Sequence, residues 1–314
     1  MKMLDKNSNV YDIIIIGAGC TGYAAAMYCG RFEMKTLVLG EVIGGTIILT
    51  DNVENYPGFK RLTGQELADK LREHALDYKN VEIKNDRVEK IEKNDKLFNV
   101  YTKKNKYCAK TIIVATGTKV KKLEVPGEYE FTNKGVHYCA LCDGPFYKNK
   151  IVGVVGGSDS AAKEALLLTQ YAKIVYIIYR GEKIHPEPIN EERVYSNKKI
   201  EIINNTNIKE IKGNKVMTHI ILDRLYKGNK ELKIDGLFVE IGHIPISDFV
   251  KPLKVKLNDK NEIIIDRTSS TNIPGIFAAG DVVDTRFKQA ITGVGEGVSA
   301  AYSAYQYINE NQLA

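Results

Sequence analysis

Long apolar runs and a secretion signal are both missing from this chain of 314 residues. No stretch approaches the 18 apolar residues of a membrane-spanning helix, and residues 1–10 are polar without an apolar core. Cysteine is scarce too: five in the whole chain exclude a small disulfide-stapled secreted protein and fit a reducing cytosol. We therefore expect a cytoplasmic protein with no membrane association.

Concentrated basic charge is also absent. The net charge of +6 comes from lysines scattered along the chain, not from a Lys/Arg block interleaved with aromatic residues, so we expect no nucleic-acid partner. The hydrophobic share of 44% and the charged share of 27% are ordinary for a globular protein. The length allows two domains, each with its own core.

The most informative residues that are present are Cys139 and Cys142, two thiols separated by two residues. This spacing allows a small disulfide and lowers the pKa of one thiol below the free value of about 8.5. The alternative is half of a zinc site, which His137 would extend. Zinc normally takes four ligands and a second paired motif, and no second Cys-x-x-Cys exists, so we expect a redox pair and no metal.

A glycine-rich loop, residues 17–22, follows an apolar run at Tyr11–Ile16 and precedes an Ala-rich helix expected over Tyr23–Arg31. In such a strand–loop–helix unit the first glycine permits a tight turn and the second lets the backbone approach a pyrophosphate. The third allows helix and strand to pack closely. An acidic residue for the ribose hydroxyls is expected about 20 positions on, and Glu41 lies there.

The same signals return after the cysteine pair. A strand over Ile151–Val155, a loop at residues 156–161, a helix over Ala162–Tyr171 and a strand over Ile174–Tyr179 predict a second βαβ unit. Its third loop position is Ser158 where glycine is usual. We also expect a helix over 62–78 capped by Thr63 and Glu66, an antiparallel meander over 81–102, and short strands over 111–115, 200–239, 263–266 and 276–279, with a final helix over 289–307.

These motifs, in this order and at this spacing, give the chain a family resemblance. They are Gly17-x-Gly19-x-x-Gly22, Gly44-Gly45, the run 53–58 (Val-Glu-Asn-Tyr-Pro-Gly), Ala115-Thr116-Gly117, the run 139–144 (Cys-Ala-Leu-Cys-Asp-Gly), Gly280-Asp281 and Gln289-Ala290. The chain resembles the low-molecular-weight thioredoxin reductases over essentially its full length. The resemblance implies an α/β fold of two Rossmann-like dinucleotide-binding domains, each with three layers around a central parallel sheet, the second inserted in the first.

The expected boundaries are 1–120 and 245–314 for the FAD domain and 121–244 for a nicotinamide-type domain that carries the cysteines. The resemblance implies FAD bound by Gly17, Gly19, Cys20, Thr21, Gly22, Gly40, Glu41, Gly44, Gly45, Thr46, Ile47, Asn55, Ala115, Thr116, Gly117, Gly280, Asp281, Lys288, Gln289 and Ala290. It further implies that Cys142 faces the flavin, that Cys139 attacks the partner disulfide, and that Asp143 handles the proton. The expected partner is thioredoxin or a glutaredoxin-like protein. Family members are homodimers whose inserted domain rotates.

The inserted domain departs from the NADPH pattern. Members that use NADPH carry His-Arg-Arg after the last strand of the second βαβ unit, with another arginine downstream; here the run 179–185 keeps one arginine, Arg180. Guanidinium groups bind a 2′-phosphate by paired hydrogen bonds that lysine and histidine reproduce poorly. The nicotinamide-binding residues expected are Gly156, Gly157, Ser158, Asp159, Ser160, Arg180 and Lys183.

Several hypotheses about function stay open at this point. The favoured one is an FAD-dependent thioredoxin-disulfide reductase using NADPH; NADH and reduced ferredoxin are the alternative donors. A third possibility is a flavin reductase for another disulfide protein, glutaredoxin-like or a peroxiredoxin. The non-enzymatic alternative is a flavin- or zinc-binding redox sensor with the same fold.

Overall fold

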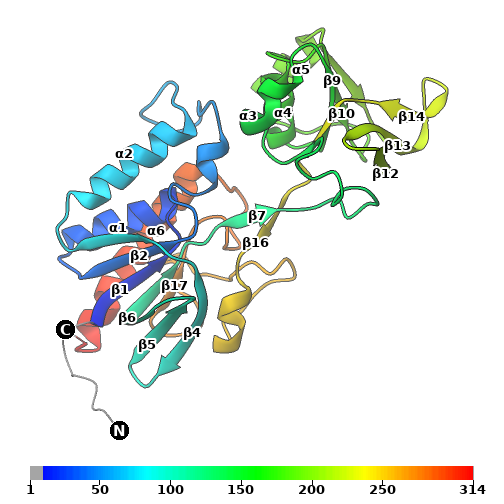
Figure 1. Cartoon of the computed structure of the whole chain (residues 1–314). Helices are drawn as coiled ribbons and strands as arrows, with labels where there is room; N and C mark the ends of the chain where they lie inside the picture. Colours follow the sequence, from blue (N-terminus) through cyan, green and yellow to red (C-terminus); the bar gives the residue numbers. More distant parts are fainter. Residues whose placement is uncertain (1–9, 314) are drawn as a thin grey trace. The chain divides into compact units, whose positions relative to one another are not determined.

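The computed structural model describes residues 10–313, which form two compact units (Figure 1). The described residues of Met1–Lys119 and Ile244–Ala314 make up unit 1, and Val120–His243 make up unit 2. The two segments that cross between the units, β7 (Thr118–Val120) and β16 (His243–Pro245), pair with each other as a two-stranded sheet. No helix within residues 10–313 is long and apolar enough to cross a membrane.

Unit 1 is built on a seven-stranded sheet in the order β3-β2-β1-β6-β5-β4, with β17 also paired to β6. Its parallel strands are β1 (Val10–Ile16), β2 (Thr36–Gly40), β3 (Val81–Asn85), β6 (Lys106–Val114) and β17 (Ile276–Ala278); β4 (Val88–Asn94) and β5 (Leu97–Thr102) are antiparallel. The long β6 pairs with β5 through its first half and with β17 through its second. The two parts of unit 1 therefore share one sheet.

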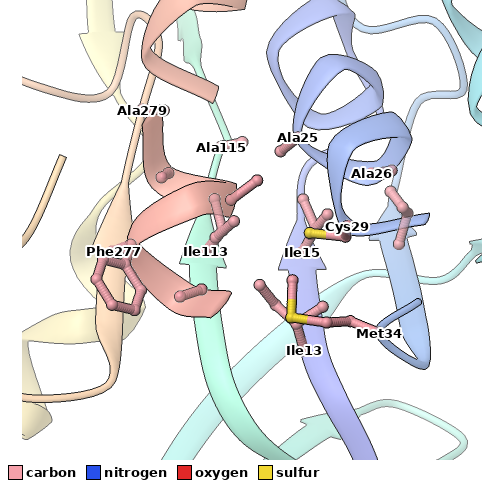
Figure 2. Close-up of a cluster of buried hydrophobic side chains, with 14 of the residues drawn as sticks. Ile13, Ile15, Ala25, Ala26, Cys29, Met34, Ile113, Ala115, Phe277 and Ala279 are labelled. Atoms are coloured by element: carbon pink, nitrogen blue, oxygen red, sulfur yellow. The ribbon is translucent and has the colours of Figure 1, made fainter. Parts of the chain in front are cut away.

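Helices α1 (Cys20–Arg31) and α6 (Ala290–Glu310) contribute to the core on one face of this sheet, as Figure 2 shows. The side chains of β1 alternate: Ile13 and Ile15 pack toward these helices, whereas Ile14 and Ile16 belong to the core on the opposite face. Because all four are fully or almost fully buried, the run reads as continuously apolar in the sequence, as expected of a central parallel strand.

Helix α6 approaches the first turn of α1 very closely. A Cβ atom on Gly293 would lie 2.5 Å from Thr21 Oγ1, and one on Gly297 would lie 2.5 Å from the Thr21 carbonyl oxygen. The two glycines are four residues apart, so they share one face of the helix. They let the C-terminal helix lie directly against the glycine-rich loop and its helix.

Unit 2 has a five-stranded parallel sheet in the order β11-β10-β9-β15-β8 and a separate antiparallel sheet, β12-β13-β14. The parallel strands are β8 (Val136–His137), β9 (Ile151–Val155), β10 (Ile174–Ile178), β11 (Ile200–Ile203) and β15 (Gly236–Val239); the others are β12 (Ile208–Gly213), β13 (Met217–Tyr226) and β14 (Asn229–Lys233). Its helices are α3 (Ala140–Asp143), α4 (Asp159–Leu168) and α5 (Pro188–Ser196). Separate apolar clusters pack the sheet's two faces. The predicted fold class, two Rossmann-like α/β domains, is confirmed.

Some predicted elements are confirmed and others are wrong. Helix α2 (Gly64–Leu76) begins with the expected capping box of Thr63 and Glu66. The meander predicted over 81–102 is wrong for β3, which is a parallel edge strand beside β2; only β4 and β5 form a hairpin. No strand forms over 263–266, where Ile263 makes only isolated bridges with Leu257 and Val283.

Candidate functional site

The first glycine-rich loop of unit 1 is closed by backbone contacts. Gly17 has φ of +126°, and a Cβ atom there would overlap the carbonyl oxygen of Ala115. A Cβ atom on Gly22 would overlap the carbonyl oxygen of Gly17. The fold itself therefore requires glycine at both positions, and this packing brings the start of α1 to the carboxyl ends of β1 and β6.

Gly19 is different, because nothing in the protein requires it to be glycine. Its backbone is extended (φ −106°, ψ −171°), and an added Cβ would meet Gly45 Cα at 3.6 Å and the Gly44 carbonyl oxygen at 3.8 Å, both ordinary contacts. Gly19 is also the N-cap of α1, which has no side-chain cap and no acidic residue in its first turn. The unpaired N–H groups of this turn and the bare backbone before them fit a pyrophosphate group.

The turn after β2 lies against this loop. Gly44 and Gly45 have φ of +97° and +71°, and a Cβ atom on Gly45 would come within 2.8 Å of Gly19 Cα. The Gly44 N–H donates to the Ala18 carbonyl oxygen at 2.8 Å and to the Tyr23 hydroxyl at 2.9 Å. Buried Tyr23 thus fixes the turn that continues into the short 3₁₀ helix η1 (Thr46–Leu49).

The C-terminal part of the chain adds a third wall. Gly280 (φ +82°) sits against Thr21, and its N–H donates to Glu296 Oε2 at 2.8 Å; the Thr285 hydroxyl donates to the other oxygen of the same carboxylate. Lys288 Nζ donates to the Asp281 carbonyl oxygen at 3.0 Å and forms an ion pair with Glu262 at 3.1 Å. In this structure Lys288 therefore holds the loop that carries Asp281.

Other predicted FAD residues are brought together across long sequence separations. Asn55 Nδ2 donates to Gln289 Oε1 at 2.9 Å, although 234 positions separate them. Thr116 Oγ1 donates to the Ile246 carbonyl oxygen at 2.7 Å, which joins the two parts of unit 1. The Glu41 side chain is exposed and paired with Arg87 at 3.1 Å.

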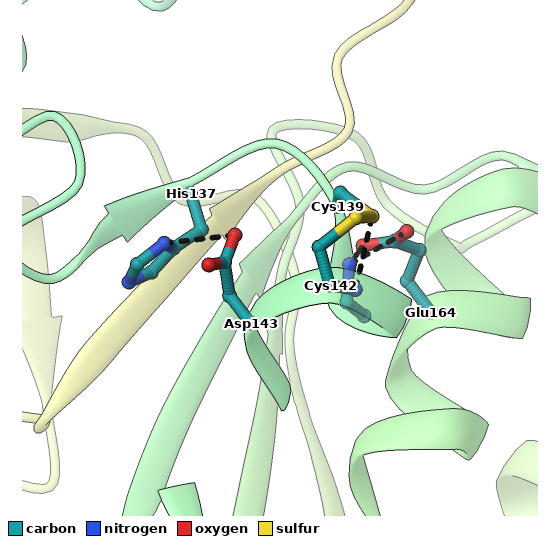
Figure 3. Close-up of a disulfide and its surroundings, with 6 residues drawn as sticks. His137, Cys139, Cys142, Asp143 and Glu164 are labelled. Carbon is teal, nitrogen blue, oxygen red and sulfur yellow. Dashed lines mark hydrogen bonds and ion pairs between the residues drawn. A yellow bond between two sulfur atoms is a disulfide. The ribbon is translucent and has the colours of Figure 1, made fainter. Parts of the chain in front are cut away.

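The cysteine pair lies in unit 2, where Cys139 and Cys142 form a disulfide at the start of α3 (Figure 3). Cys139 is 8% exposed, whereas Cys142 is exposed. The Cys142 N–H points at Cys139 Sγ, 3.1 Å away. The other three cysteines are free, and burial raises the pKa of Cys20 to about 12 and also raises the pKa of Cys29 and of Cys108. These three are held as unreactive thiols.

Two acidic side chains contact the turn that carries the disulfide or a residue beside it. The Ala140 N–H donates to both carboxylate oxygens of Glu164, each at 3.1 Å. Burial, together with the charge of Glu164, raises the pKa of Glu240 to about 8. Figure 3 shows the Asp143 carboxylate directed at the His137 ring, with its Oδ2 atom 3.1 Å from His137 Nδ1. Glu164 and Asp143 are therefore both tied to the helical turn that carries the disulfide, Asp143 through a buried imidazole.

The second glycine-rich loop is built differently from the first. Gly156 (φ +149°) abuts the carbonyl oxygen of Glu240, so it matches Gly17 in its role. A Cβ atom on Gly157 would overlap the ring of Tyr179, which follows β10 and also packs on Gly181. Gly157 is the second residue of its loop, as Ala18 is of the first loop, and in unit 2 this position is covered by the Tyr179 ring.

The residues after this loop are largely engaged with one another. The Asp159 carboxylate accepts the Glu187 N–H at 3.0 Å and an Asn190 amide hydrogen at 2.8 Å, and forms an ion pair with Lys163 at 2.7 Å. Ser158 is the N-cap of α4 without a side-chain cap bond. Among the remaining predicted nicotinamide contacts, Ser160 and Arg180 are exposed and Lys183 is paired with Glu191 at 2.6 Å.

Comparison with known proteins decides the family. The family model described as pyridine nucleotide-disulphide oxidoreductase matches residues 11–297. The thioredoxin reductase of Mycolicibacterium smegmatis is 38% identical over 311 residues, which cover 98% of this chain and 99% of that protein. The chain belongs to the thioredoxin reductase family.

Solved structures of thioredoxin reductases agree with this assignment. The Lactococcus lactis enzyme in its FR conformation is 40% identical, with a TM-score of 0.92, and the match covers 96% of this chain and 99% of that one. A ferredoxin-flavin thioredoxin reductase from Clostridium acetobutylicum is 32% identical, with a TM-score of 0.54 and coverage of 98% and 100%.

The thioredoxin reductase motifs found in the sequence did not include every residue that shapes the site. Tyr23, Glu296 and Glu164 each bond a backbone N–H of a predicted motif, but none belongs to a motif itself. Glu296 is the one acidic residue inside the Ala- and Gly-rich stretch predicted as the last helix, a signal that could have indicated it. Within residues 10–313, no group of three or more His, Cys, Asp and Glu side chains is arranged to hold a metal ion.

The contrast between Gly19 and its neighbours gives a test of flavin binding. We expect Gly19→Ala to fold normally, because the added methyl meets no protein atom closer than 3.6 Å. It should weaken flavin binding by about tenfold or more, because the methyl occupies the approach of a pyrophosphate. Flavin absorbance after gel filtration and the urea midpoint measure the two effects. Gly295→Ala, at an open position on α6, is the matched control, and a Gly19→Ala protein with full flavin content and affinity would contradict the assignment.

Proposed function

We propose that this protein is an FAD-dependent thioredoxin-disulfide reductase whose exchange centre is the Cys139–Cys142 pair. The observation that carries the proposal is a disulfide within a dinucleotide-type unit of a chain that belongs to the thioredoxin reductase family. Membership supports a flavin and a nicotinamide donor in general terms. Bound FAD would supply the electron pair that reduces the disulfide.

Unit 1 has the residues to hold FAD. The loop with Gly17, Gly19 and Gly22 and the first turn of α1 would receive the pyrophosphate. Gly44 and Gly45 would line the same groove, and the Asn55–Gln289 pair at the start of α6 would contact the ring system or its ribityl chain. These assignments rest on the family resemblance and on the fit of the open position at Gly19.

The exchange chemistry is a two-step transfer between sulfurs. The Cys139 thiolate attacks one sulfur of the partner disulfide, so that bond breaks and a Cys139–partner bond forms. The Cys142 sulfur then attacks Cys139, which closes the Cys139–Cys142 disulfide and releases the partner dithiol. The enzyme dithiol loses two electrons and two protons, and the partner gains both. Asp143 would be the group that transfers a proton between these sulfurs.

The local structure favours Cys139 as the attacking thiolate, because the Cys142 N–H at 3.1 Å would stabilise a negative charge on Cys139 Sγ. The greater exposure of Cys142 favours the opposite assignment. The family resemblance assigns the attack to Cys139, and we adopt that assignment.

NADPH is the donor that we propose first, with NADH second. Arg180 is exposed and available to a 2′-phosphate, but Lys183 is already paired with Glu191. The Tyr179 ring over Gly157 leaves less open backbone than the first loop offers. The relative from Clostridium acetobutylicum, which is named a ferredoxin-flavin thioredoxin reductase, makes reduced ferredoxin the alternative donor.

We also propose a homodimer that acts on thioredoxin or a glutaredoxin-like protein.

Trapping a mixed disulfide distinguishes the two cysteines. With Cys142→Ser, the Cys139 thiolate should attack a single-cysteine thioredoxin whose thiol carries a thionitrobenzoate group; the thionitrobenzoate thiolate leaves, and the enzyme–thioredoxin disulfide accumulates because no second thiol resolves it. Cys139→Ser should form no such complex, and both variants should lose more than 99% of turnover, since either sulfur is indispensable to the cycle. Non-reducing gels and mass spectrometry measure the complex. A covalent complex with Cys139→Ser but not with Cys142→Ser would show that Cys142 is the attacking sulfur. Undiminished turnover in either variant would refute the Cys139–Cys142 pair as the exchange centre.

Stopped-flow mixing of the oxidised protein with each donor identifies the reductant. We expect NADPH to bleach the flavin absorbance. NADH should also bleach it, with an affinity within about one to two decades of that for NADPH, because one arginine contact to the 2′-phosphate of NADPH is missing. Arg180→Ala should weaken NADPH more than NADH. If neither nucleotide bleaches the flavin while reduced ferredoxin does, the donor proposed here is wrong and the disulfide chemistry stands.

A further inference from the structure

His137 is a buried polar residue that lies two positions before Cys139, in β8. Its Nε2 atom is 2.6 Å from the Tyr147 hydroxyl oxygen, and its Nδ1 atom is 3.1 Å from Asp143 Oδ2. Nδ1 is buried and has no hydrogen-bond partner besides this ion-pair contact. Both ring nitrogens are therefore directed at single, identifiable groups, one of which is the carboxylate that we place in proton transfer.

Aromatic packing holds the imidazole in this orientation. The His137 ring stacks on Phe238 with centroids 5.3 Å apart and meets the Tyr147 ring edge-on at 5.5 Å. Tyr147 and Phe238 also pack edge-on, at 5.6 Å. Because three rings contact one another in pairs inside a buried cluster, the imidazole cannot turn away from Asp143 without breaking this packing.

The charge states of the cluster follow from its burial. Burial lowers the pKa of His137 although Asp143 opposes this, and burial, with the charges of Asp143 and Asp235, raises the pKa of Tyr147 to about 12. Lys150 also faces this cluster, with its ammonium 6.0 Å from the Tyr147 ring centre. At neutral pH the imidazole is therefore neutral and the phenol keeps its proton. Because an ionised Asp143 carboxylate only accepts, we assign the imidazole proton to Nδ1, and Nε2 then accepts from the phenol.

We propose that His137 is a positioning residue that, with Tyr147 behind it, orients the Asp143 carboxylate for proton transfer during thiol–disulfide exchange. The inference rests on the proposed function. His137 takes up no proton over the cycle; it fixes the carboxylate and supplies an N–H that stabilises the carboxylate as an anion. The competing explanation is a buried histidine that only completes the core.

Four variants separate these explanations. His137→Phe preserves the ring packing and removes both nitrogens, whereas His137→Asn restores an N–H donor close to the place of Nδ1. Tyr147→Phe removes only the hydroxyl that fixes the tautomer. Asp143→Asn removes the carboxylate on which His137 would act, so its combination with His137→Phe completes a double-mutant cycle.

The measurement is single-turnover reduction of a small aromatic disulfide (DTNB) by the flavin-loaded protein, reduced beforehand with dithiothreitol and desalted without oxygen. This assay needs neither the nicotinamide donor nor thioredoxin. Rates are recorded at neutral pH, and the urea midpoint of each variant is recorded in parallel. We expect Asp143→Asn to slow the exchange about 100-fold, because it removes the group that transfers the proton.

His137→Phe should slow the exchange about tenfold, because the Asp143 carboxylate loses the N–H that orients it. His137→Asn should recover most of the rate, and Tyr147→Phe should give a smaller loss of rate. In the Asp143→Asn background, His137→Phe should cost less than about twofold. Such coupling is expected only of residues that act together.

Three results would overturn the proposal: an unchanged rate in His137→Phe, an equal loss of rate from His137→Phe in both Asp143 backgrounds, or no effect of Asp143→Asn on the rate. A loss of rate that only follows the urea midpoint would identify His137 as a core residue. The proposed function fails separately, if the wild-type protein exchanges with the small disulfide but reduces no thioredoxin with any donor.

Discussion

The contact that the rest of unit 1 depends on is the backbone packing of Gly17 against Ala115. These residues lie at the ends of β1 and β6, and no side chain fits between them. The loop is therefore forced over the carboxyl edge of the parallel sheet, where the first turn of α1 points its free N–H groups outward. Gly22, Gly293 and Gly297 then let α1 and α6 approach to backbone contact. Each of these glycines is fixed by sterics inside the protein.

Gly19 stands apart from that set, and this difference carries functional information. A glycine at a position where the fold leaves no room for a side chain is explained by the packing and gives no information about ligands. A glycine at a position where a side chain would fit is explained better by a bound ligand. The second loop illustrates the distinction, since Gly157 is covered by Tyr179 and is needed for packing. The two loops of similar sequence thus differ in how much bare backbone they offer to a nucleotide.

In unit 2 the controlling feature is a set of ionisable groups linked to the disulfide turn directly or through one neighbour. Glu164 is bonded to the Ala140 N–H, Glu240 has a raised pKa because of burial, and Asp143 faces His137. Thiol–disulfide exchange moves protons as well as electrons, so the placement of proton-binding groups determines how the sulfurs behave. The thioredoxin reductase chemistry therefore depends on a polar cluster as much as on the two cysteines.

Much of this architecture could be predicted from the sequence because its signals are local. Each of three signals depends only on residues that are neighbours in the sequence: the apolar run at Tyr11–Ile16, the Gly17–Gly22 loop and the Cys139–Cys142 spacing. The edge strand β3 was misassigned as part of a meander, because a half-exposed parallel edge strand alternates in the same way as a hairpin strand. The apolar residues after Glu262 suggest a strand, although Ile263 alone is fully buried, Ile265 packs against the core only in part and Ile264 is exposed.

The contacts that position the site were beyond local reasoning. Tyr23 and Glu296 bond to backbone groups 21 and 16 positions away, respectively. Asn55 meets Gln289 only because the two parts of unit 1 share a sheet. From the sequence His137 is recognisable only as a possible zinc ligand, because nothing there indicates that Tyr147 and Asp143 face its two nitrogens. Such pairings arise from tertiary packing.

The central claim is that the Cys139–Cys142 pair alternates between disulfide and dithiol, while the other three cysteines take no part. Differential alkylation with peptide mass spectrometry tests it on the flavin-loaded protein, first oxidised, then reduced without oxygen, then mixed with oxidised thioredoxin. The account predicts that Cys139 and Cys142 become alkylated only in the reduced sample and are protected again after thioredoxin is added. Unchanged labelling of this pair, or a redox change confined to Cys20, Cys29 or Cys108, would contradict it.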